Sequence, residues 1–511
     1  MLFISFFLVI FALINLLLTL VSFKPVFKLV TVLVLLISAS AAYFMDNYAV
    51  MIDKGMLRNV FATNVNEANE LFSLRILITI FLLGILPAFL LIKTKVAYKP
   101  FFRGIFEKLA VVVVCVAVIA GTLLSNYQSL TFFGREHREL RHLINPTNYI
   151  FALKSIISTS IKSGVVVAKP VENDARKVAY VNDDGKPNLV ILVLGETARA
   201  MNFSLNGYKR YTNPLLAKRL AKQEIVNFSD VSSCGTATAV SVPCLFSKFS
   251  RDDFSYDKGK AFYNVLDVIK NANYEMLWRD NNTGCQGTCE RIEFDNLAHK
   301  KDPRFCDDGN CVDDILLDGL QTIVDGKGET AKKDRFIILH QKGNHGPTYS
   351  RRYPKEFEVF KPVCKTNQLQ SCTQEEVVNA YDNAILYTDS FLDKTINFLK
   401  QNDQKFNTAM VYLSDHGESL GENNLYLHGL PYMIAPDEQK KVPFILWLSD
   451  NYQKNYAINK SCLENKSQDT LSHDNFFSSM LGLTAVQTSV HDSKLDIFES
   501  CKQTKLAKSS Q

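Results

Sequence analysis

The chain has 511 residues and a formal net charge of +5 at pH 7. This length exceeds that of one ordinary domain, so we expect two units of different character. The positive charge lies in residues 1–130, which hold ten Lys/Arg against five Asp/Glu, and the neutral remainder lacks the basic excess that nucleic-acid binding requires.

Four apolar segments in the first quarter of the chain are each close to the roughly 20 residues that cross a bilayer. These nearly uncharged segments are residues 1–20, 29–44, 76–92 and 109–125. A cleaved signal peptide is the alternative for residues 1–20, but no basic segment precedes this run and no small-residue cleavage site follows it before Lys24. The sequence therefore predicts an integral membrane protein whose helical transmembrane domain occupies residues 1–130.

The charges of the connecting loops predict the orientation of these helices. Five Lys/Arg crowd residues 93–108, and Lys24 and Lys28 occupy another loop, whereas residues 45–72 carry four acidic side chains against two basic ones. Positively charged loops stay in the cytoplasm. We therefore expect the loop of residues 45–72, and everything after residue 126, to face outward, away from the cytoplasm.

Cysteine usage agrees with an oxidising exterior. Ten of the eleven cysteines lie in the outward part, mostly in close pairs, and an even number in an exported domain indicates disulfides. Cys115 is then an ordinary apolar residue of the last membrane helix. A zinc cluster built on CQGTC is the alternative, which the redox conditions outside the cytoplasm disfavour. The predicted pairs are Cys234–Cys244, Cys285–Cys289, Cys306–Cys311, Cys364–Cys372 and Cys462–Cys501.

The outward part begins with a transition and continues with a folded domain. Residues 131–187 are expected to form a partly amphipathic helix along the membrane surface and then a linker. From residue 188 to residue 511, short apolar runs alternate with longer helical stretches, which predicts an α/β sandwich with a mostly parallel central sheet. The apolar runs are residues 188–196, 273–281, 335–343, 408–418 and 442–449.

Polar side chains follow four of these runs. Glu196 ends the first run, Asn281 and Asn282 end the second, the loop HQKGNHGP ends the third, and Asp415-His416 ends the fourth. Ligands of open α/β sheets bind at the carboxyl ends of the strands. Because Glu, Asp and His are suitable zinc ligands, the sequence predicts a zinc site at this edge of the sheet.

The loop SSCGTATAVSVPCLFS, residues 232–247, offers a nucleophile. A Thr or Ser hydroxyl is a poor nucleophile until a base or a metal lowers its effective pKa, so it would need to lie beside the zinc. Composition and spacing leave Thr236, Thr238 and Ser241 open. A Ser/Thr-rich turn closed by a disulfide is the alternative, since such residues are common in turns.

Five motifs in order resemble those of the bacterial phosphoethanolamine transferases that modify lipid A, members of the alkaline-phosphatase and sulfatase superfamily. The likeness covers most of residues 1–500. The motifs are LGETARAMNFSLNGYKRYTNP, SSCGTATAVSVPCLFS, HQKGNHGPTYSRRYP, NAYDNAILYTD and YLSDHGESLGENNLYLHGLPY. The resemblance implies that Thr238, the second threonine of CGTAT, is the nucleophile. The zinc ligands it implies are Glu196, Thr238, Asp415 and His416.

The resemblance also implies a two-step exchange. Thr238 would take phosphoethanolamine from phosphatidylethanolamine, forming a phosphothreonine, and an acceptor would then remove the group. The expected acceptors are a lipid A phosphate, a lipooligosaccharide core sugar or a periplasmic protein hydroxyl. His345 and His428 would handle protons or line a second metal position beside one tightly bound zinc, although a purely structural hydrogen-bonding role is the alternative. We expect a monomer in the inner membrane.

Substrate contacts are expected from the membrane part as well. Asn59, Thr63 and Glu67 recur every four residues, so on a helix they share one face, about 6 Å of rise apart. The family uses this motif near the lipid headgroup, whereas a solvated polar face is the alternative. Asn282 and Gln286 are expected to contact substrate too. Gln286 departs from the basic residue of many relatives, which predicts weaker phosphate binding or a changed acceptor preference.

Two further expectations concern helix number and rival functions. The family usually has five membrane helices with its amino terminus inside, whereas this sequence has four and the charge rule puts Met1 outside, so an initial helix is absent or the true start lies upstream. A glycerophosphate transferase, or a periplasmic phosphodiesterase or sulfatase, would share the fold. A non-enzymatic membrane sensor would have lost a metal ligand, and none is missing.

Overall fold

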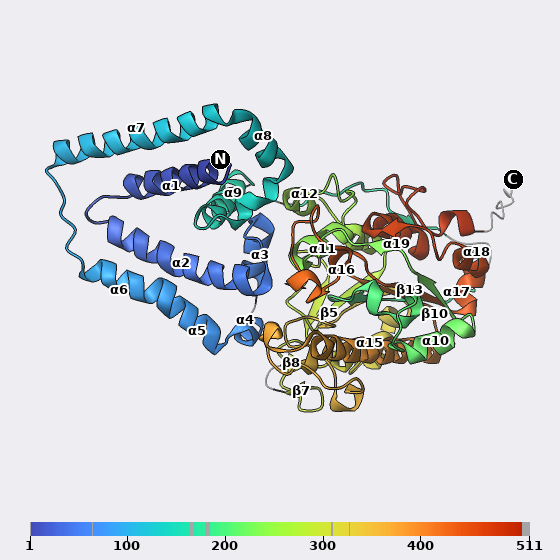
Figure 1. Cartoon of the computed structure of the whole chain (residues 1–511). Coiled ribbons are helices and arrows are strands. Elements are labelled where there is room, and N and C mark those ends of the chain that lie inside the picture. The colour runs from blue at the N-terminus through green and yellow to red at the C-terminus, as the bar shows by residue number, and fades with distance from the viewer. Residues whose placement is uncertain are drawn as a thin grey trace. The chain divides into compact units, whose positions relative to one another are not determined.

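The computed structural model describes residues 2–63, 65–163, 167–178, 184–307, 310–326 and 328–502. The chain forms two compact units (Figure 1). The first comprises Met1–Lys54 and Phe72–Ser155, and the second comprises Gly55–Leu71 and Ile156–Gln511. The segment of residues 55–71, although it lies between membrane helices in the sequence, therefore packs with the second unit.

Within the described residues, the first unit contains four helices long and apolar enough to cross a membrane. They match the four predicted segments, and Cys115 is buried in the last of them as expected. The third is one continuous helical segment that consists of α5, a π-helical turn at Phe81–Ile85, and α6. The bounds are α1 Leu2–Leu20, α2 Phe27–Tyr48, α5 Leu74–Ile80, α6 Leu86–Lys93 and α7 Phe101–Ser125.

The predicted surface helix is interrupted. Its first part is α8 (Tyr127–Glu136), a 3-10 turn follows at Arg138–Leu143, and α9 covers Thr147–Ser163. In the segment between α2 and α5, the structure has α3 (Lys54–Ala62) and α4 (Val65–Leu71).

A seven-stranded sheet in the order β3-β13-β10-β2-β9-β5-β6 forms the centre of the second unit. From β10 to β6 all neighbouring strands are parallel, and β13 is antiparallel to both β10 and β3. The prediction of a mostly parallel sheet is confirmed. The strands are β2 Asn188–Gly195, β3 Ile225–Phe228, β5 Glu275–Asp280, β6 Glu293–Asn296, β9 Arg335–His340, β10 Asn407–Ser414 and β13 Phe444–Leu448.

Both faces of the sheet are buried, which explains why the central strands are continuously apolar. Along β2, Val190 and Leu192 belong to one hydrophobic core, and Leu189 and Ile191 belong to the other, because successive strand residues point to opposite faces. Helices α13 and α19 cover the first face and α15 covers the second, and Figure 1 shows α15 and α19 on opposite sides of the strands.

Shorter elements surround this sheet. The helices are α10 Pro214–Ala221, α11 Thr238–Leu245, α12 Tyr256–Ala261, α13 Val265–Asn271, α14 Leu320–Asp325, α15 Gln374–Asn402, α16 Asp437–Lys440, α17 Asp450–Asn455, α18 Lys460–Asn465 and α19 Phe476–Thr484. The two-residue strands pair as β1 Arg176–Lys177 with β15 Val486–Gln487, β4 Val231–Ser232 with β14 Leu471–Ser472, β7 Cys306–Asp307 with β8 Asn310–Cys311, and β11 Ser419–Leu420 with β12 Tyr426–Leu427. All five predicted disulfides are present.

Candidate active site

The register of the parallel strands brings the predicted ligands to one edge of the sheet. Gly195 at the end of β2 is opposite Ser414 at the end of β10. On the other side of β2, Leu194 is opposite His340, which is in turn opposite Asp280 of β5. The residues that directly follow these strand ends therefore meet, as the sequence predicted for Glu196, Asn282 and the Asp415-His416 pair.

Glu196, Asp415 and His416 form a fully buried cluster. One ligand atom from each lies within 4.8 Å of the others. His416 Nε2 is 3.5 Å from Glu196 Oε1 and 3.4 Å from Asp415 Oδ2. Thr238 joins them, with Oγ1 3.1 and 3.2 Å from the two carboxylate oxygens of Glu196 and 3.3 Å from His416 Nε2. The four residues predicted as ligands are thus together.

The donor atoms of this cluster fit a divalent cation. His416 Nδ1 donates to the carbonyl of Gly417 over 2.8 Å, which leaves the lone pair of Nε2 facing the two carboxylates. Burial and the nearby His428 lower the pKa of His416 to about 4, so its ring is neutral. Asp415 Oδ2 is buried and has no hydrogen-bond partner among the described residues. Two carboxylates, an imidazole and a hydroxyl are a suitable tetrahedral set for zinc.

The charge of the cluster also calls for a cation. Burial and the adjacent charge of Glu196 raise the pKa of Asp415 well above its ordinary range. Two carboxylates this close cannot both ionise in a dry site unless a positive charge compensates them. A bound cation would supply that charge.

A strained residue connects the two carboxylates. Thr197 has a φ of 58°, a left-handed conformation that is unfavourable for a β-branched side chain. Its N–H donates to Asp415 Oδ1 over 3.1 Å, and its hydroxyl donates to Glu196 Oε1 over 2.6 Å. These bonds hold the conformation and fix both carboxylates relative to each other.

The three candidate nucleophiles differ in the hydrogen bonds that their hydroxyls form. The hydroxyl of Thr236 donates to the Leu430 carbonyl over 2.6 Å, and that of Ser241 donates to the Asp415 carbonyl over 2.5 Å. Thr238 is the one of the three whose hydroxyl reaches the cluster. Thr238 is half-buried and is the first residue of α11.

His473 supports this loop and was not predicted from the sequence. Its Nε2 donates to the Ser414 carbonyl over 3.0 Å, and its Nδ1 accepts from the Cys234 N–H over 3.1 Å. Burial lowers the pKa of His473 to about 3, so the ring stays neutral. It ties the disulfide-closed nucleophile loop to the end of β10. Its partners are distant in sequence, so no local pattern identifies it.

Asn282 lies behind Glu196. Its amide donates to Glu196 Oε2 over 2.6 Å and to the Gln341 carbonyl over 3.0 Å, and it is 3.2 Å from His340 Nε2. His340 Nδ1 in turn donates to Asp280 Oδ1 over 2.7 Å. The observed contacts of the Asn282 amide are therefore with protein groups, and they orient Glu196. His340 and Asp280 are further residues that the sequence did not single out.

His428 and His345 lie next to the cluster. The His428 ring is 4.3 Å from that of His416 and 5.5 Å from that of His345, measured between ring centroids. His428 Nδ1 donates to Glu418 over 2.6 Å, and the Tyr349 hydroxyl donates to the other oxygen of Glu418. Although burial opposes protonation, Glu418 raises the pKa of His428 to about 9. His428 thus carries a proton that it can donate.

The segment of residues 55–71 brings Asn59 near Gly429. A Cβ atom added to Gly429, next to His428, would lie 4.0 Å from Asn59 Nδ2. Thr63 donates through its hydroxyl to the Asn59 carbonyl over 2.8 Å. Asn59 lies in α3, which ends at Ala62, whereas Glu67 lies in α4, which begins at Val65, so the three residues are not on one continuous helix. The side chain of Glu67 lies outside the described residues, and the shared face stays a prediction.

Gln286 lines a cavity of about 800 Å³ within the second unit. Ala239, directly after Thr238, lines the same cavity, and so do Arg58, Lys260 and Arg291. Gln286 has a φ of 52° and its amide is 3.4 Å from the Thr283 hydroxyl. The cavity therefore places Gln286 and several cationic side chains close to the nucleophile loop.

Two protein families match this chain. The family described as phosphoethanolamine transferase EptA/EptB matches residues 10–161, and the sulfatase family matches residues 188–486. The second match alone covers more than half of the chain, and it coincides with the α/β unit that carries the cluster.

Relatives match over nearly the whole length. Phosphoethanolamine transferase EptA of Escherichia coli K12 is 41% identical over 502 residues, which cover 96% of this chain and 89% of the relative. Phosphatidylethanolamine transferase Mcr-1 of Escherichia coli is 37% identical over 83% of this chain and 79% of its own. The structure of lipooligosaccharide phosphoethanolamine transferase A from Neisseria meningitidis superposes with a TM-score of 0.92 at 36% identity, covering 97% of this chain and 91% of that one.

Proposed function

Because this chain belongs to the EptA family of phosphoethanolamine transferases, we propose that it transfers phosphoethanolamine from phosphatidylethanolamine to lipid A or another acceptor of the bacterial envelope. The observation that carries this proposal is the position of Thr238, whose hydroxyl lies within 3.3 Å of Glu196 and His416 in a buried ligand cluster. The proposed location is the inner membrane, with the second unit in the periplasm.

The proposed cofactor is zinc, held by Glu196, Asp415, His416 and Thr238. When bound, zinc supplies a Lewis acid that lowers the pKa of a coordinated hydroxyl and polarises a phosphoryl oxygen. The cluster fits this role because its donors are oxygen and nitrogen atoms, and because Asp415 Oδ2 has no hydrogen-bond partner in the part of the chain that the structure describes. One tightly bound ion is proposed, with a second position beside His345 and His428.

The first step uses Thr238 as the nucleophile. Thr238 loses its hydroxyl proton to solvent as Oγ1 attacks the phosphorus of phosphatidylethanolamine, and the P–O bond to the glycerol oxygen breaks. Diacylglycerol leaves with a proton, and phosphoethanolamine stays on the threonine as a phosphodiester. In the second step, an acceptor hydroxyl or phosphate oxygen attacks the same phosphorus, the P–O bond to Thr238 breaks, and Oγ1 takes up a proton, which restores the threonine.

His428 is proposed to protonate the leaving glycerol oxygen. Its ring lies 4.3 Å from His416, and Glu418 keeps it protonated at neutral pH. A donor of this kind is needed because an alkoxide is a poor leaving group. His345, 5.5 Å from His428, is proposed to contact the phosphate or to take the proton of the acceptor.

Asn59, Thr63 and Glu67 are proposed to contact the donor headgroup, and Gln286 is proposed to contact the phosphate from its cavity. Asn282 is proposed to act on the substrate side through Glu196, which it orients. The chain is proposed to work as a monomer. Candidate acceptors are a lipid A phosphate, a lipooligosaccharide core sugar and a periplasmic protein hydroxyl.

The test is mass spectrometry of lipid A from a host strain that expresses this chain, Thr238→Ala or Thr238→Ser. A phosphoethanolamine-sized mass increment is expected with the intact chain, none with Thr238→Ala, and a reduced one with Thr238→Ser, which keeps a hydroxyl. A phosphoglycerol increment instead would indicate the glycerophosphate transferase alternative. Hydrolysis of phosphate or sulfate esters without any transfer would indicate a phosphodiesterase or sulfatase.

If lipid A is unmodified, the same strains are analysed for modified core sugars and for peptides that carry phosphoethanolamine on Thr238. A modified Thr238 peptide would retain the nucleophile and move the acceptor elsewhere. Full activity in Thr238→Ala would remove Thr238 from the proposed mechanism.

A further inference from the structure

Glu70 of α4 and Arg352 form a buried ion pair that the proposed mechanism does not use. Their side chains are 4% and 1% exposed, respectively. We infer that this pair is a positioning device, which ties the segment proposed to contact the donor to the loop that carries His345. The inference rests on the proposed function, because it assigns Glu70 and Arg352 to the same reaction.

Arg352 connects several elements through its guanidinium. Nε donates to the carbonyl of His345 over 2.6 Å. Nη2 donates to Glu70 Oε2 and, over 3.2 Å, to the Thr348 hydroxyl. The bond to the His345 carbonyl matters most, because it fixes the backbone from which the His345 side chain extends.

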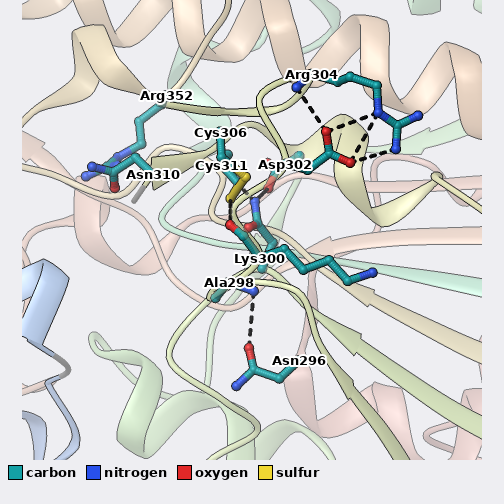
Figure 2. Close-up of a disulfide and its surroundings, with 11 residues drawn as sticks. Asn296, Ala298, Lys300, Asp302, Arg304, Cys306, Asn310, Cys311 and Arg352 are labelled. Atoms are coloured by element: carbon teal, nitrogen blue, oxygen red, sulfur yellow. Dashed lines mark hydrogen bonds and ion pairs between the residues drawn. A yellow bond between two sulfur atoms is a disulfide. The ribbon is translucent and has the colours of Figure 1, made fainter. Parts of the chain in front are cut away.

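Nη1 of Arg352 reaches a third element. It donates to Asn310 Oδ1 over 3.4 Å, and Asn310 belongs to the β7-β8 hairpin closed by Cys306–Cys311. Figure 2 shows the Arg352 side chain beside Asn310. The guanidinium is thus held from both sides, by a cross-linked hairpin and by α4.

Glu70 has contacts that suit a fixed connection. Its Oε2 also accepts from the Thr348 hydroxyl over 2.7 Å, and its main-chain carbonyl accepts from Asn367 over 2.6 Å. Its Oε1 is buried without a hydrogen-bond partner among the described residues. The charge of Glu70 therefore depends on Arg352, since a buried carboxylate is stable only when it is paired.

The pair links the two sides of the proposed donor site. Glu70 lies eleven residues after Asn59 in the segment of residues 55–71, and Asn59 approaches Gly429 beside His428. Arg352 lies seven residues after His345. If this pair is broken, α4 loses its charged partner, and replacement of Arg352 also removes the donor to the His345 carbonyl. Donor binding and proton handling should therefore change together.

The experiment uses the purified full-length chain with zinc in detergent and phosphatidylethanolamine as the donor. The measured quantity is the rate of Thr238 loading, which is the transfer of phosphoethanolamine from the donor to Thr238. It is followed by intact-protein mass over a range of donor concentrations, for the wild type, Glu70→Gln, Arg352→Lys and Thr348→Val. Arg219→Lys is the matched control, because Arg219 forms a comparable pair with Asp393 over 2.7 Å between α10 and α15. Each variant is repeated in a His345→Ala background.

We expect Glu70→Gln and Arg352→Lys to slow loading at least tenfold and to raise the donor KM, and Thr348→Val to have a smaller effect of the same kind. In the His345→Ala background, the same changes should lower the rate at saturating donor less than twofold, since groups that act through one residue are not additive. Arg219→Lys should leave both parameters within twofold of the wild type.

The inference is overturned if the full rate loss persists in the His345→Ala background, or if the losses follow the drop in thermal midpoint equally in all variants. If Glu70→Gln does not fold, Thr348→Val decides, and wild-type kinetics in that variant would count against the inference. Failure of the proposed function is distinct, because the wild type itself would then show no loading of Thr238.

Discussion

Two buried charge clusters in the second unit differ in how their charge is balanced. At the candidate active site, Glu196 and Asp415 lie together with a neutral His416, so negative charge exceeds positive charge. At Glu70, one carboxylate meets one guanidinium and the pair is neutral. Burial is similar in both clusters, but only the first requires a partner from solution.

The difference in charge balance corresponds to a difference in role. The first cluster is suited to bind an ion, whereas the Glu70–Arg352 pair is suited to hold two segments of the chain in place. A cluster with excess charge is stabilised by an ion, so its occupancy can change with conditions. A neutral pair needs no ion and keeps its geometry, but it is costly to break because either partner alone is a buried charge. The same substitution of carboxylate by amide should therefore have opposite effects on the stability of the two regions.

The largest expected effect is that of Asp415→Asn. It should abolish zinc binding and lower transferase activity by at least about 100-fold, because it removes a ligand. It should also raise the thermal midpoint of the metal-free protein, by roughly 2–4 °C for each kcal/mol gained, since a buried amide needs neither a cation nor a bound proton, whereas the raised pKa of Asp415 means that burying this acid without metal costs stability at neutral pH. Metal analysis and thermal unfolding check both results, with Asp393→Asn as a control away from the site. Retained zinc with full activity would exclude Asp415 as a ligand.

Removal of the metal should affect the candidate active site and leave the Glu70–Arg352 pair unchanged. Chelation should abolish activity in the wild type and zinc should restore it. Zinc at 100 times its Kd should stabilise the wild type by about 2.7 kcal/mol. Thermal unfolding with and without zinc should show the same gain for Glu70→Gln and none for Asp415→Asn. A smaller gain in Glu70→Gln would mean that the two clusters are coupled.

The pH dependence of stability should report on the Glu70 pair. Although burial favours the neutral acid, Arg352 lowers the pKa of Glu70 from 4.5 to about 2. A lowered pKa contributes stability that is fully present above pH 4.5 and is lost as the pH falls towards 2, in all about 3 kcal/mol. The difference in unfolding free energy between wild type and Glu70→Gln should therefore shrink over this range. A difference that stays constant with pH would contradict the shifted pKa.

The smallest expected effect is that of Gln286→Lys. A cation in the cavity next to the nucleophile loop should lower the KM for a phosphate-bearing substrate about three- to tenfold, with kcat nearly unchanged, because a charge-assisted hydrogen bond replaces a neutral one. Gln286→Met, of similar length and without a polar end, is the control. An unchanged KM in Gln286→Lys would mean that this position does not contact the phosphate.

The sequence was informative where function follows a local pattern. Glu196 and the Asp415-His416 pair directly follow apolar strands, and the parallel pairing of β2 with β10 brings these positions together. The choice among Thr236, Thr238 and Ser241 depended on the resemblance, because it is decided by contacts to Leu430 and Asp415 that no spacing reveals. For the same reason His473 and the Glu70–Arg352 pair were missed: their partners are distant in sequence.

The fold shows a similar limit. Five apolar runs predicted β2, β5, β9, β10 and β13, but β3 and β6 were not predicted. Strand β6 reads EFDN and is largely exposed at the sheet edge, so it has no apolar run. Strand β3 has only four residues. The antiparallel direction of β13 follows from its connections, which hydrophobic periodicity does not encode.

The order of strands in the central sheet has a consequence for biosynthesis. Strand β2 is the first long strand to be made, but its neighbour β10 ends at Ser414. At the usual 5–20 residues per second, the ribosome needs about 10–40 s to produce the intervening chain. Until then β2 has an open edge and Glu196 has no Asp415 beside it. The metal centre is therefore among the last features to form, and a chain truncated before β10 would contain the nucleophile loop without a site to activate it.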